Sequence, residues 1–117
     1  IRIHDTSKTH PSYIINDIFR YKGVILGSCA YNGGIFPTME TLLNELEHMG
    51  VKNHLVSFFA NKTWAGGAVP RFTQFADKMK WEIVCPHAEA TGALSSTDTE
   101  ECYNIASAMA EKLITGN

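Results

Sequence analysis

Apolar residues follow two different spacings along this chain, and the spacings alternate. Gly23–Gly27 and Leu55–Phe59 are almost wholly apolar runs, which is the pattern of strands buried on both faces. Ile1–Asp5 and Trp81–Val84 alternate apolar with polar residues, which predicts strands that bury one face only. Apolar residues three and four positions apart predict helices in the segments between and after these strands, namely Ser12–Phe19, Thr38–Met49, Pro70–Met79 and Thr97–Leu113.

Strands and helices therefore alternate four times from one end of the chain to the other. This order predicts an α/β fold with a parallel sheet, helices on both faces and right-handed crossovers. Helix limits follow from particular residues: Thr38 is expected to cap the second helix and Gly50 to end it in a left-handed conformation. Pro70 is expected at the start of the third helix, and Thr97 with Glu100 as a capping box of the fourth. Cys85–Leu94 is expected to be a loop.

Composition narrows the classes of function. The 117 residues are 44% hydrophobic and 19% charged, as in an ordinary globular domain, and the formal charge of −2 favours no nucleic-acid partner. No apolar run reaches the roughly 20 residues of a membrane helix, and no signal-peptide pattern is recognised. Three scattered cysteines argue against a disulfide framework. We expect one domain, 1–117, in the cytoplasm, with neither a membrane nor a nucleic acid as partner.

Two glycine-bearing loops follow the two apolar strands, and each carries a large aromatic residue. Ser28–Gly34 contains Tyr31, and Asn61–Gly67 contains Trp64. Ligands of open α/β sheets bind at the carboxyl ends of strands, so these loops are the first candidate site. The two aromatic rings could flank a flat ligand ring whose edge is read by backbone groups. Tight turns between strands and helices would explain the same residues without any ligand, and spacing alone leaves both interpretations open.

The first loop also matches a known pattern. Val24–Asn32, followed by Ile35-Phe36-Pro37, resembles the second flavin loop of flavodoxin-like domains, and above all that of the A-type flavoproteins, or flavodiiron proteins. Their pattern there is Gly-Ser-Pro-Thr-Tyr-Asn and then Phe-Pro. Cys29 and Ala30 replace the Pro and the Thr of that pattern.

The second loop resembles the third flavin loop of the same family. Trp64, Gly66 and Ala68 match its Gly-Ser-Tyr-Gly-Trp-(Ser/Gly)-Gly region, whereas Ala60–Thr63 depart from it. The resemblance covers nearly the whole chain and implies a flavodoxin-like, three-layer α/β/α parallel sheet with four strands in this chain.

The resemblance also implies electron transfer by FMN. Tyr31 and Trp64 would contact the flavin ring, and no residue would have an acid–base, nucleophilic or metal-binding role. In the family the electrons pass to a di-iron site in a β-lactamase-like domain, across a head-to-tail homo-oligomer, and carriers such as rubredoxin are the outside partners. The residues implied in cofactor binding are Ser28, Cys29, Ala30, Tyr31, Asn32, Thr63, Trp64, Ala65 and Gly66.

One part of the family pattern is missing. Flavodoxin-like domains begin with a strand, a phosphate loop and a helix, and in their strand order the first strand would lie between the Ile1 and Gly23 strands. An unfilled gap would leave backbone groups unpaired. The Ile1 strand of a shortened chain could pair directly with the Gly23 strand, a second chain could donate a strand, or the natural protein could be longer. We favour a truncated domain, and because the phosphate loop is absent we expect it to bind FMN weakly or not at all.

Other functions are less favoured by the residues. A flavin-free remnant or interaction module is the main alternative, since Cys29, Ala30, Lys62 and Thr63 depart from the family pattern. Cys85-Pro86-His87 is the one place where two metal-ligand types meet, but no paired ligand motif accompanies it. Cys29 as a nucleophile, Gly66-Gly67 as a nucleotide phosphate loop and Asp5 as a phospho-acceptor each lack the partner residues that such chemistry needs.

Overall fold

The computed structural model describes residues 2–31, 34–62, 68–84, 88–91 and 96–115. Within them the chain forms helices and strands in the following order: α1 (Pro11–Arg20), β1 (Gly23–Tyr31), β2 (Gly34–Ile35), α2 (Pro37–Met49), β3 (Leu55–Lys62), α3 (Ala68–Met79), β4 (Glu82–Ile83), β5 (Ala88–Thr91) and α4 (Ser96–Thr115).

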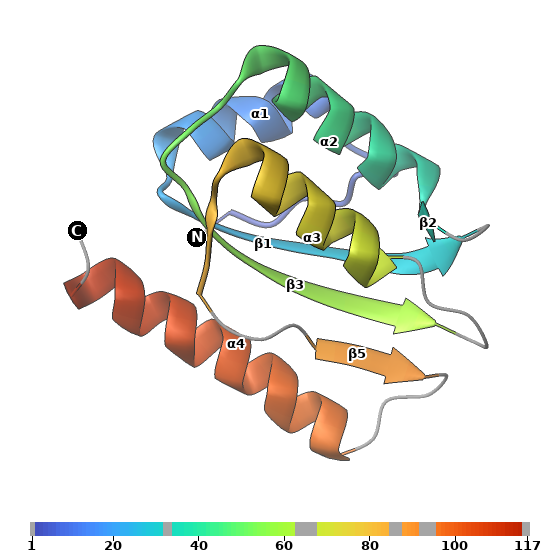
Figure 1. Ribbon diagram of the computed structural model, residues 1–117, viewed down its shortest axis with the longest axis vertical. Coiled ribbons are helices and arrows are strands. Elements are labelled where there is room, and N and C mark those ends of the chain that lie inside the picture. Colours follow the sequence, from blue (N-terminus) through green and yellow to red (C-terminus); the bar gives the residue numbers. More distant parts are fainter. Residues whose placement is uncertain (1, 32–33, 63–67, 85–87, 92–95, 116–117) are drawn as a thin grey trace.

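The sheet is built on two long parallel strands. β1 pairs with β3 from Gly23 opposite Leu55 to Cys29 opposite Asn61. The other edge of β3 pairs in parallel with β4 along its first residues and with β5 along its last ones. α1, α2 and α3 lie on one face of this sheet and α4 on the other (Figure 1). The predicted α/β fold, a parallel sheet between layers of helices, is confirmed.

The main core lies between the sheet and the three helices of one face. α2 contributes Met39, Leu42, Leu43 and Leu46, and the rings of Phe58 in β3 and Phe72 in α3 stack with centroids 4.8 Å apart. All these side chains are buried. α4 covers the opposite face in part, with Met109 and Leu113 placed over Gly23. None of the described helices is both long and apolar enough to cross a membrane.

Helix ends agree with the sequence at one position and differ at three. Gly50 has φ 68°, and its N–H donates to the carbonyls of Leu46 and Glu47, as predicted for the end of α2. Thr38 is not the cap of α2: Phe36 occupies that position, and the Thr38 hydroxyl lies 2.9 Å from that of Thr6 instead. α3 begins at Ala68 rather than at Pro70, and α4 begins at Ser96, which places Thr97 inside the helix.

The predicted first strand is wrong within the described residues. Arg2–Asp5 pairs with no strand, and Ile3 is 91% exposed. Side chains rather than a backbone ladder hold this segment, because His4 Nε2 and Arg2 Nε donate to Asp17 Oδ2 in α1 over 2.7 and 3.3 Å. The direct pairing of this segment with the Gly23 strand, which we favoured from the sequence, does not occur. Its alternating pattern predicted the extended conformation but could not supply a partner strand.

Two short strands were not expected from the sequence. β5 lies inside the segment predicted as a loop, because its small residues carry no periodic pattern and only pairing with β3 defines it. β2 forms an antiparallel hairpin with the end of β1, Ala30 opposite Ile35 and Tyr31 opposite Gly34. β1 and β3 also run further than their apolar runs, and the two extensions pair with each other as far as Cys29 and Asn61.

Candidate functional site

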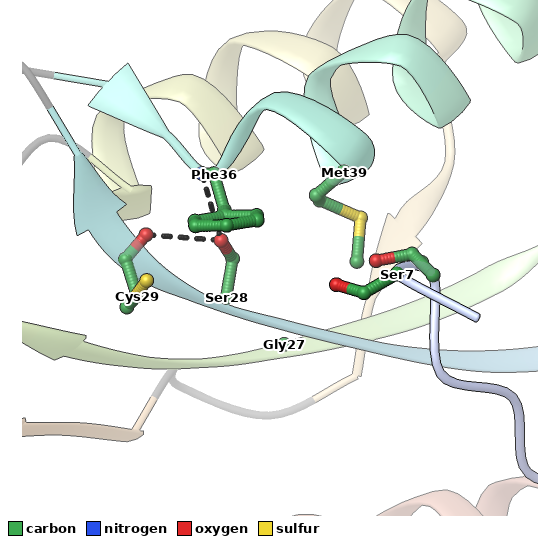
Figure 2. Close-up of a pocket in the computed structure, with 7 residues that line it drawn as sticks. Ser7, Gly27, Ser28, Cys29, Phe36 and Met39 are labelled. Carbon is green, nitrogen blue, oxygen red and sulfur yellow. Dashed lines mark hydrogen bonds between the residues drawn. The ribbon is translucent and has the colours of Figure 1, made fainter.

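A cavity of about 270 Å³ opens at the carboxyl end of β1. The end of β1 forms its floor, the start of α2 one wall and the amino-terminal turn the other (Figure 2). This is the position at which open α/β sheets bind ligands. The residues that line it are Thr6, Ser7, Gly27, Ser28, Cys29, Phe36 and Met39.

Ser28 holds this end of β1 against the start of α2. Its hydroxyl accepts the N–H of Phe36 at 3.0 Å and donates to the carbonyl of Cys29 at 2.9 Å. Figure 2 shows both bonds, with the Phe36 ring next to the Ser28 hydroxyl. β2 pairs with Ala30 and Tyr31, directly after the β1 residues that line the cavity. The Ser28 side chain therefore ties the end of β1 to the start of α2 and keeps only a lone pair for a ligand.

The opposite wall comes from a turn that sequence reasoning did not assign to the site. The Ser7 N–H donates to Asp5 Oδ1 at 2.8 Å, which fixes the turn, and Thr6 bonds to Thr38 in the first turn of α2. Met39 points toward Ser7 across the cavity (Figure 2). The hydroxyls in Thr6–Ser7 were the available signal, but only the tertiary fold shows that they face β1.

The structure brings part of the predicted site together. Ser28 and Cys29 line the cavity, and Cys29 is exposed. The backbones of Ala30 and Tyr31 lie in β1, and their side chains are outside the described part of the structure. Five further predicted residues also lie outside the described residues and stay predictions: Asn32, Thr63, Trp64, Ala65 and Gly66.

The starting points of the two predicted loops do lie side by side. β1 and β3 are parallel, and Cys29 is opposite Asn61 in their register. β3 ends at Lys62, so the second loop leaves the sheet at the same end as the first. The two loops therefore start at one rim of the sheet, as the sequence predicted.

The lining of the cavity is partly polar and partly apolar, and it carries no formal charge. Its lining offers hydroxyls, a thiol, an aromatic ring and a thioether, and none of the described lining residues is a lysine, arginine, aspartate or glutamate. Within the described residues no three His, Cys, Asp or Glu side chains gather where they could hold a metal ion. The lining residues can therefore form hydrogen bonds and apolar contacts with a neutral group.

Solved structures with this architecture include flavodoxins and flavodiiron proteins. The rubredoxin oxygen:oxidoreductase of Desulfovibrio gigas superposes with a TM-score of 0.92 over 97% of this chain and 28% of its own, at 20% identity. A flavodoxin from the domain Archaea gives a TM-score of 0.78 over 93% of this chain and 74% of its own, at 16% identity. The chain therefore has the flavodoxin-like fold.

The sequence relatives of this chain are flavorubredoxins. An anaerobic nitric oxide reductase flavorubredoxin of Pectobacterium carotovorum is 30% identical over 91 residues, which is 69% of this chain and 18% of that protein. The Escherichia coli flavorubredoxin is 29% identical over 73 residues. The chain spans less than a fifth of the length of these curated relatives, at 18% and 15%. No family model matches the sequence. The chain is a flavodoxin-like domain that is similar in sequence to part of these flavorubredoxins.

Proposed function

We propose that this chain is the FMN-binding, electron-transfer module of a flavodiiron-type oxidoreductase. The observation that carries the proposal is the cavity at the carboxyl end of β1, which is built from the loop that matches the family's flavin pattern. The fold and the sequence relatives support the same assignment.

The described walls fit part of an FMN molecule. Hydroxyls at Thr6, Ser7 and Ser28 suit hydrogen bonding to a ring edge and to a hydroxylated chain, while Phe36 and Met39 offer apolar contact. A volume of about 270 Å³ lies just below the roughly 300 to 1,000 Å³ typical of small-molecule pockets. No cationic side chain lines the described walls, so nothing there neutralises a phosphate. This donor set supports weak binding that depends on the ring and its chain.

Bound FMN would supply one- and two-electron redox chemistry. The residues of this chain would bind and orient it: Ser28 holds the end of β1 against the start of α2, and Phe36 offers an apolar wall on the α2 side. Tyr31 and Trp64 are proposed to flank the ring. The ring edge and the ribityl chain are proposed to meet backbone or polar groups of Cys29, Ala30, Asn32, Thr63, Ala65 and Gly66.

The partners of the proposed module follow from the flavodiiron type. Electrons would pass to a di-iron centre in a β-lactamase-like domain of a longer parent protein, in a cytoplasmic homo-oligomer, and would arrive from a carrier such as rubredoxin. The names of the relatives, flavorubredoxin and rubredoxin oxygen:oxidoreductase, connect those proteins with rubredoxin.

A flavin-free interaction module is the second candidate function. Two observations favour it: the described cavity walls lack a cation, and the Ser28 hydroxyl is occupied by the chain's own backbone. In that case the cavity would be a remnant of a flavin site.

Titration with two flavins separates the candidates. FMN and riboflavin are added to the purified chain while flavin fluorescence is followed. We expect saturable quenching with both flavins at similar affinity, because the described walls do not hold the phosphate. Ser28→Ala should weaken the binding of both flavins by about tenfold, since the hydrogen bond from the Phe36 N–H to the Ser28 hydroxyl is lost. Thr41→Ala is the control, because its exposed hydroxyl bonds only to the Pro37 carbonyl within α2.

Two outcomes would contradict the proposal. No quenching with either flavin at millimolar concentration would favour the flavin-free module. Tight binding of FMN but not of riboflavin would show a phosphate site in this chain and overturn the expectation of weak, phosphate-independent binding.

A further inference from the structure

His54 is a buried histidine whose two ring nitrogens both face carbonyl oxygens. It lies just before β3, at the end of the sheet opposite to the cavity, and is 8% exposed. Its Nδ1 atom lies 2.8 Å from the carbonyl oxygen of Lys52, and its Nε2 atom lies 2.6 Å from the carbonyl oxygen of Ile18 in α1. A neutral imidazole has one N–H and one lone pair, so it can donate to only one of these oxygens. Both contacts are hydrogen bonds only when both ring nitrogens carry a proton.

The Ile18 carbonyl belongs to the last turn of α1. Carbonyls of a last helical turn have no partner within the helix, and they form the negative end of its dipole. Of the carbonyls in this turn, that of Asp17 accepts the Tyr21 N–H, and that of Ile18 is bonded to the His54 ring. The ring therefore caps α1 from another part of the chain, at a position where a positive charge is stabilised.

The indole of Trp81 covers one face of the His54 ring. The two ring centroids are 4.9 Å apart at an interplanar angle of 29°, and Trp81 is buried. Its Nε1 donates to the Val51 carbonyl at 2.9 Å, and the ring of Phe75 packs edge-on against it, so the indole is fixed in place. The face of an indole attracts a cation. Two carbonyls, a helix end and an aromatic face thus offset the cost of burying a charged ring.

Among the described residues, no carboxylate forms an ion pair with this ring. The charged residues of the surrounding segments come from α1, from the loops before β1 and β3, and from both sides of Trp81: Asp17, Arg20, Lys22, Lys52, Lys80 and Glu82. The Asp17 carboxylate is bonded to Arg2 and His4, and that of Glu82 pairs with Lys112. The other four side chains are exposed. Neutral acceptors therefore hold the second proton of the ring.

We propose that His54 is a proton-dependent joint between α1 and the loop before β3. In the folded chain its imidazolium donates to both carbonyls and ties the two segments together. At higher pH the ring releases one proton to solvent, one of the two hydrogen bonds is lost, and the carboxyl end of α1 is held less firmly. The proposal does not depend on flavin binding, and its test contains no flavin.

The direction of the pH dependence follows from proton binding. In an unfolded chain a histidine releases its proton near pH 6.5, to about half a unit. Below that pH both states carry the proton, and the joint contributes its full stability. Above it the folded chain binds one proton more than the unfolded chain, so the equilibrium constant of unfolding should rise by up to about tenfold per pH unit. Urea unfolding followed by circular dichroism, from about pH 6 to about pH 9, measures this rise.

Replacement of single histidines identifies the group that titrates. His54→Gln keeps a side chain that can donate to one carbonyl but cannot take up a proton, so the rise in the unfolding constant should disappear. His4→Gln and His10→Gln are the matched controls, because these histidines are also bonded to α1, at Asp17 and Ser12. Both controls should keep the rise that His54 causes.

Nuclear magnetic resonance of the ring needs no variant. In the unchanged chain with ¹⁵N-labelled histidine, at a pH of about 7.5, His54 should show two slowly exchanging ring N–H protons, one on each nitrogen. Their proximity to protons of Trp81 and Ile18 assigns them to this ring. A neutral ring would show one such proton.

Three results would overturn the proposal. A single ring N–H proton at this pH would show that His54 is neutral in the folded chain, and this measurement decides even if His54→Gln does not fold. An unfolding constant of the unchanged chain that stays level above pH 6.5, to about half a unit, would show that folding takes up no proton. A rise that persists in His54→Gln and disappears in His4→Gln or His10→Gln would assign the proton to another histidine.

Discussion

The two faces of the sheet are covered to very different extents, and two neighbouring residues show it. Phe58 and Phe59 follow each other in β3; the first points into the core under α3 and is 1% exposed, while the second lies on the α4 side and is 45% exposed. Three helices cover the first face and one covers part of the second (Figure 1). We infer that the first face carries most of the stability of the chain.

Truncation of the two phenylalanines is expected to give the largest contrast. Phe58→Ala removes a buried ring that stacks on Phe72, so the free energy of unfolding should fall by about 3 to 5 kcal/mol. Phe59→Ala removes a half-exposed ring, and the loss should be about 1 kcal/mol. Urea unfolding followed by circular dichroism measures both. Equal losses would show that the α4 face is as important for stability as the other.

The ion pairs of the two faces allow a second comparison. Arg71 of α3 donates from Nε and Nη2 to both carboxylate oxygens of Glu40, at 2.8 to 3.0 Å, and from Nη1 to Glu47 at 3.2 Å. Its hydrogen bonds to Glu40 raise the pKa of Arg71 above the ordinary value. Arg71→Ala should cost about 2 kcal/mol of unfolding free energy, because charge-assisted bonds between α2 and α3 are lost.

The matched variant on the α4 side is Lys112→Ala. The Nζ atom of Lys112 lies 3.1 Å from Oε2 of Glu82, but both side chains are well exposed. The substitution should therefore lower the free energy of unfolding by less than about 1 kcal/mol. Measurement at high salt sharpens the comparison, since screening should abolish the small Lys112 effect and leave most of the Arg71 effect. A Lys112 variant that loses as much stability as the Arg71 variant would contradict the contrast between the faces.

The smallest expected effect concerns the amino-terminal segment and pH. The hydrogen bond from His4, aided by Arg2, lowers the pKa of Asp17 below its ordinary value of 3.8. A lowered carboxyl pKa in the folded state contributes stability that is present above pH 3.8 and is lost as the pH falls toward the folded-state value. The free energy of unfolding, measured across this pH range, should fall as the pH is lowered, and it should fall less steeply in Asp17→Asn.

Asp77→Asn, on the exposed side of α3, controls for the loss of one carboxylate. If the free energy of unfolding of Asp17→Asn changed with pH as steeply as that of the unchanged chain, the amino-terminal segment would not be anchored to α1 through this carboxylate.

Much of the fold could be predicted because its central elements carry their own patterns. The apolar runs of β1 and β3, the stripe of α2 and the left-handed Gly50 are all local signals. Arg2–Asp5 and β5 were predicted wrongly because strand formation depends on a pairing partner, which no local pattern reveals. Thr38 failed as a cap because tertiary structure gave its hydroxyl another partner in Thr6.

The candidate site, too, could be predicted only in part from the sequence. Ser28 and Cys29 were predicted from a loop pattern within one stretch of sequence, and they line the cavity. Thr6, Ser7 and Met39 line it too, but they come from segments far apart in the sequence, so only the folded chain brings them together. The proposed ring contacts of Tyr31 and Trp64 stay predictions.

The contact between Phe59 and Gly27 has a consequence for strand alignment. The two residues are opposite each other in the register of β1 and β3, and a Cβ on Gly27 would lie 1.9 Å from the ring of Phe59. The aromatic ring thus occupies the space that a side chain on Gly27 would fill. If β3 slid by two residues along β1, the ring would meet Ile25 or Cys29 in place of the glycine. The pairing of a bulky residue with a glycine therefore favours the observed alignment of the two strands, which also sets Cys29 opposite Asn61 at their carboxyl ends.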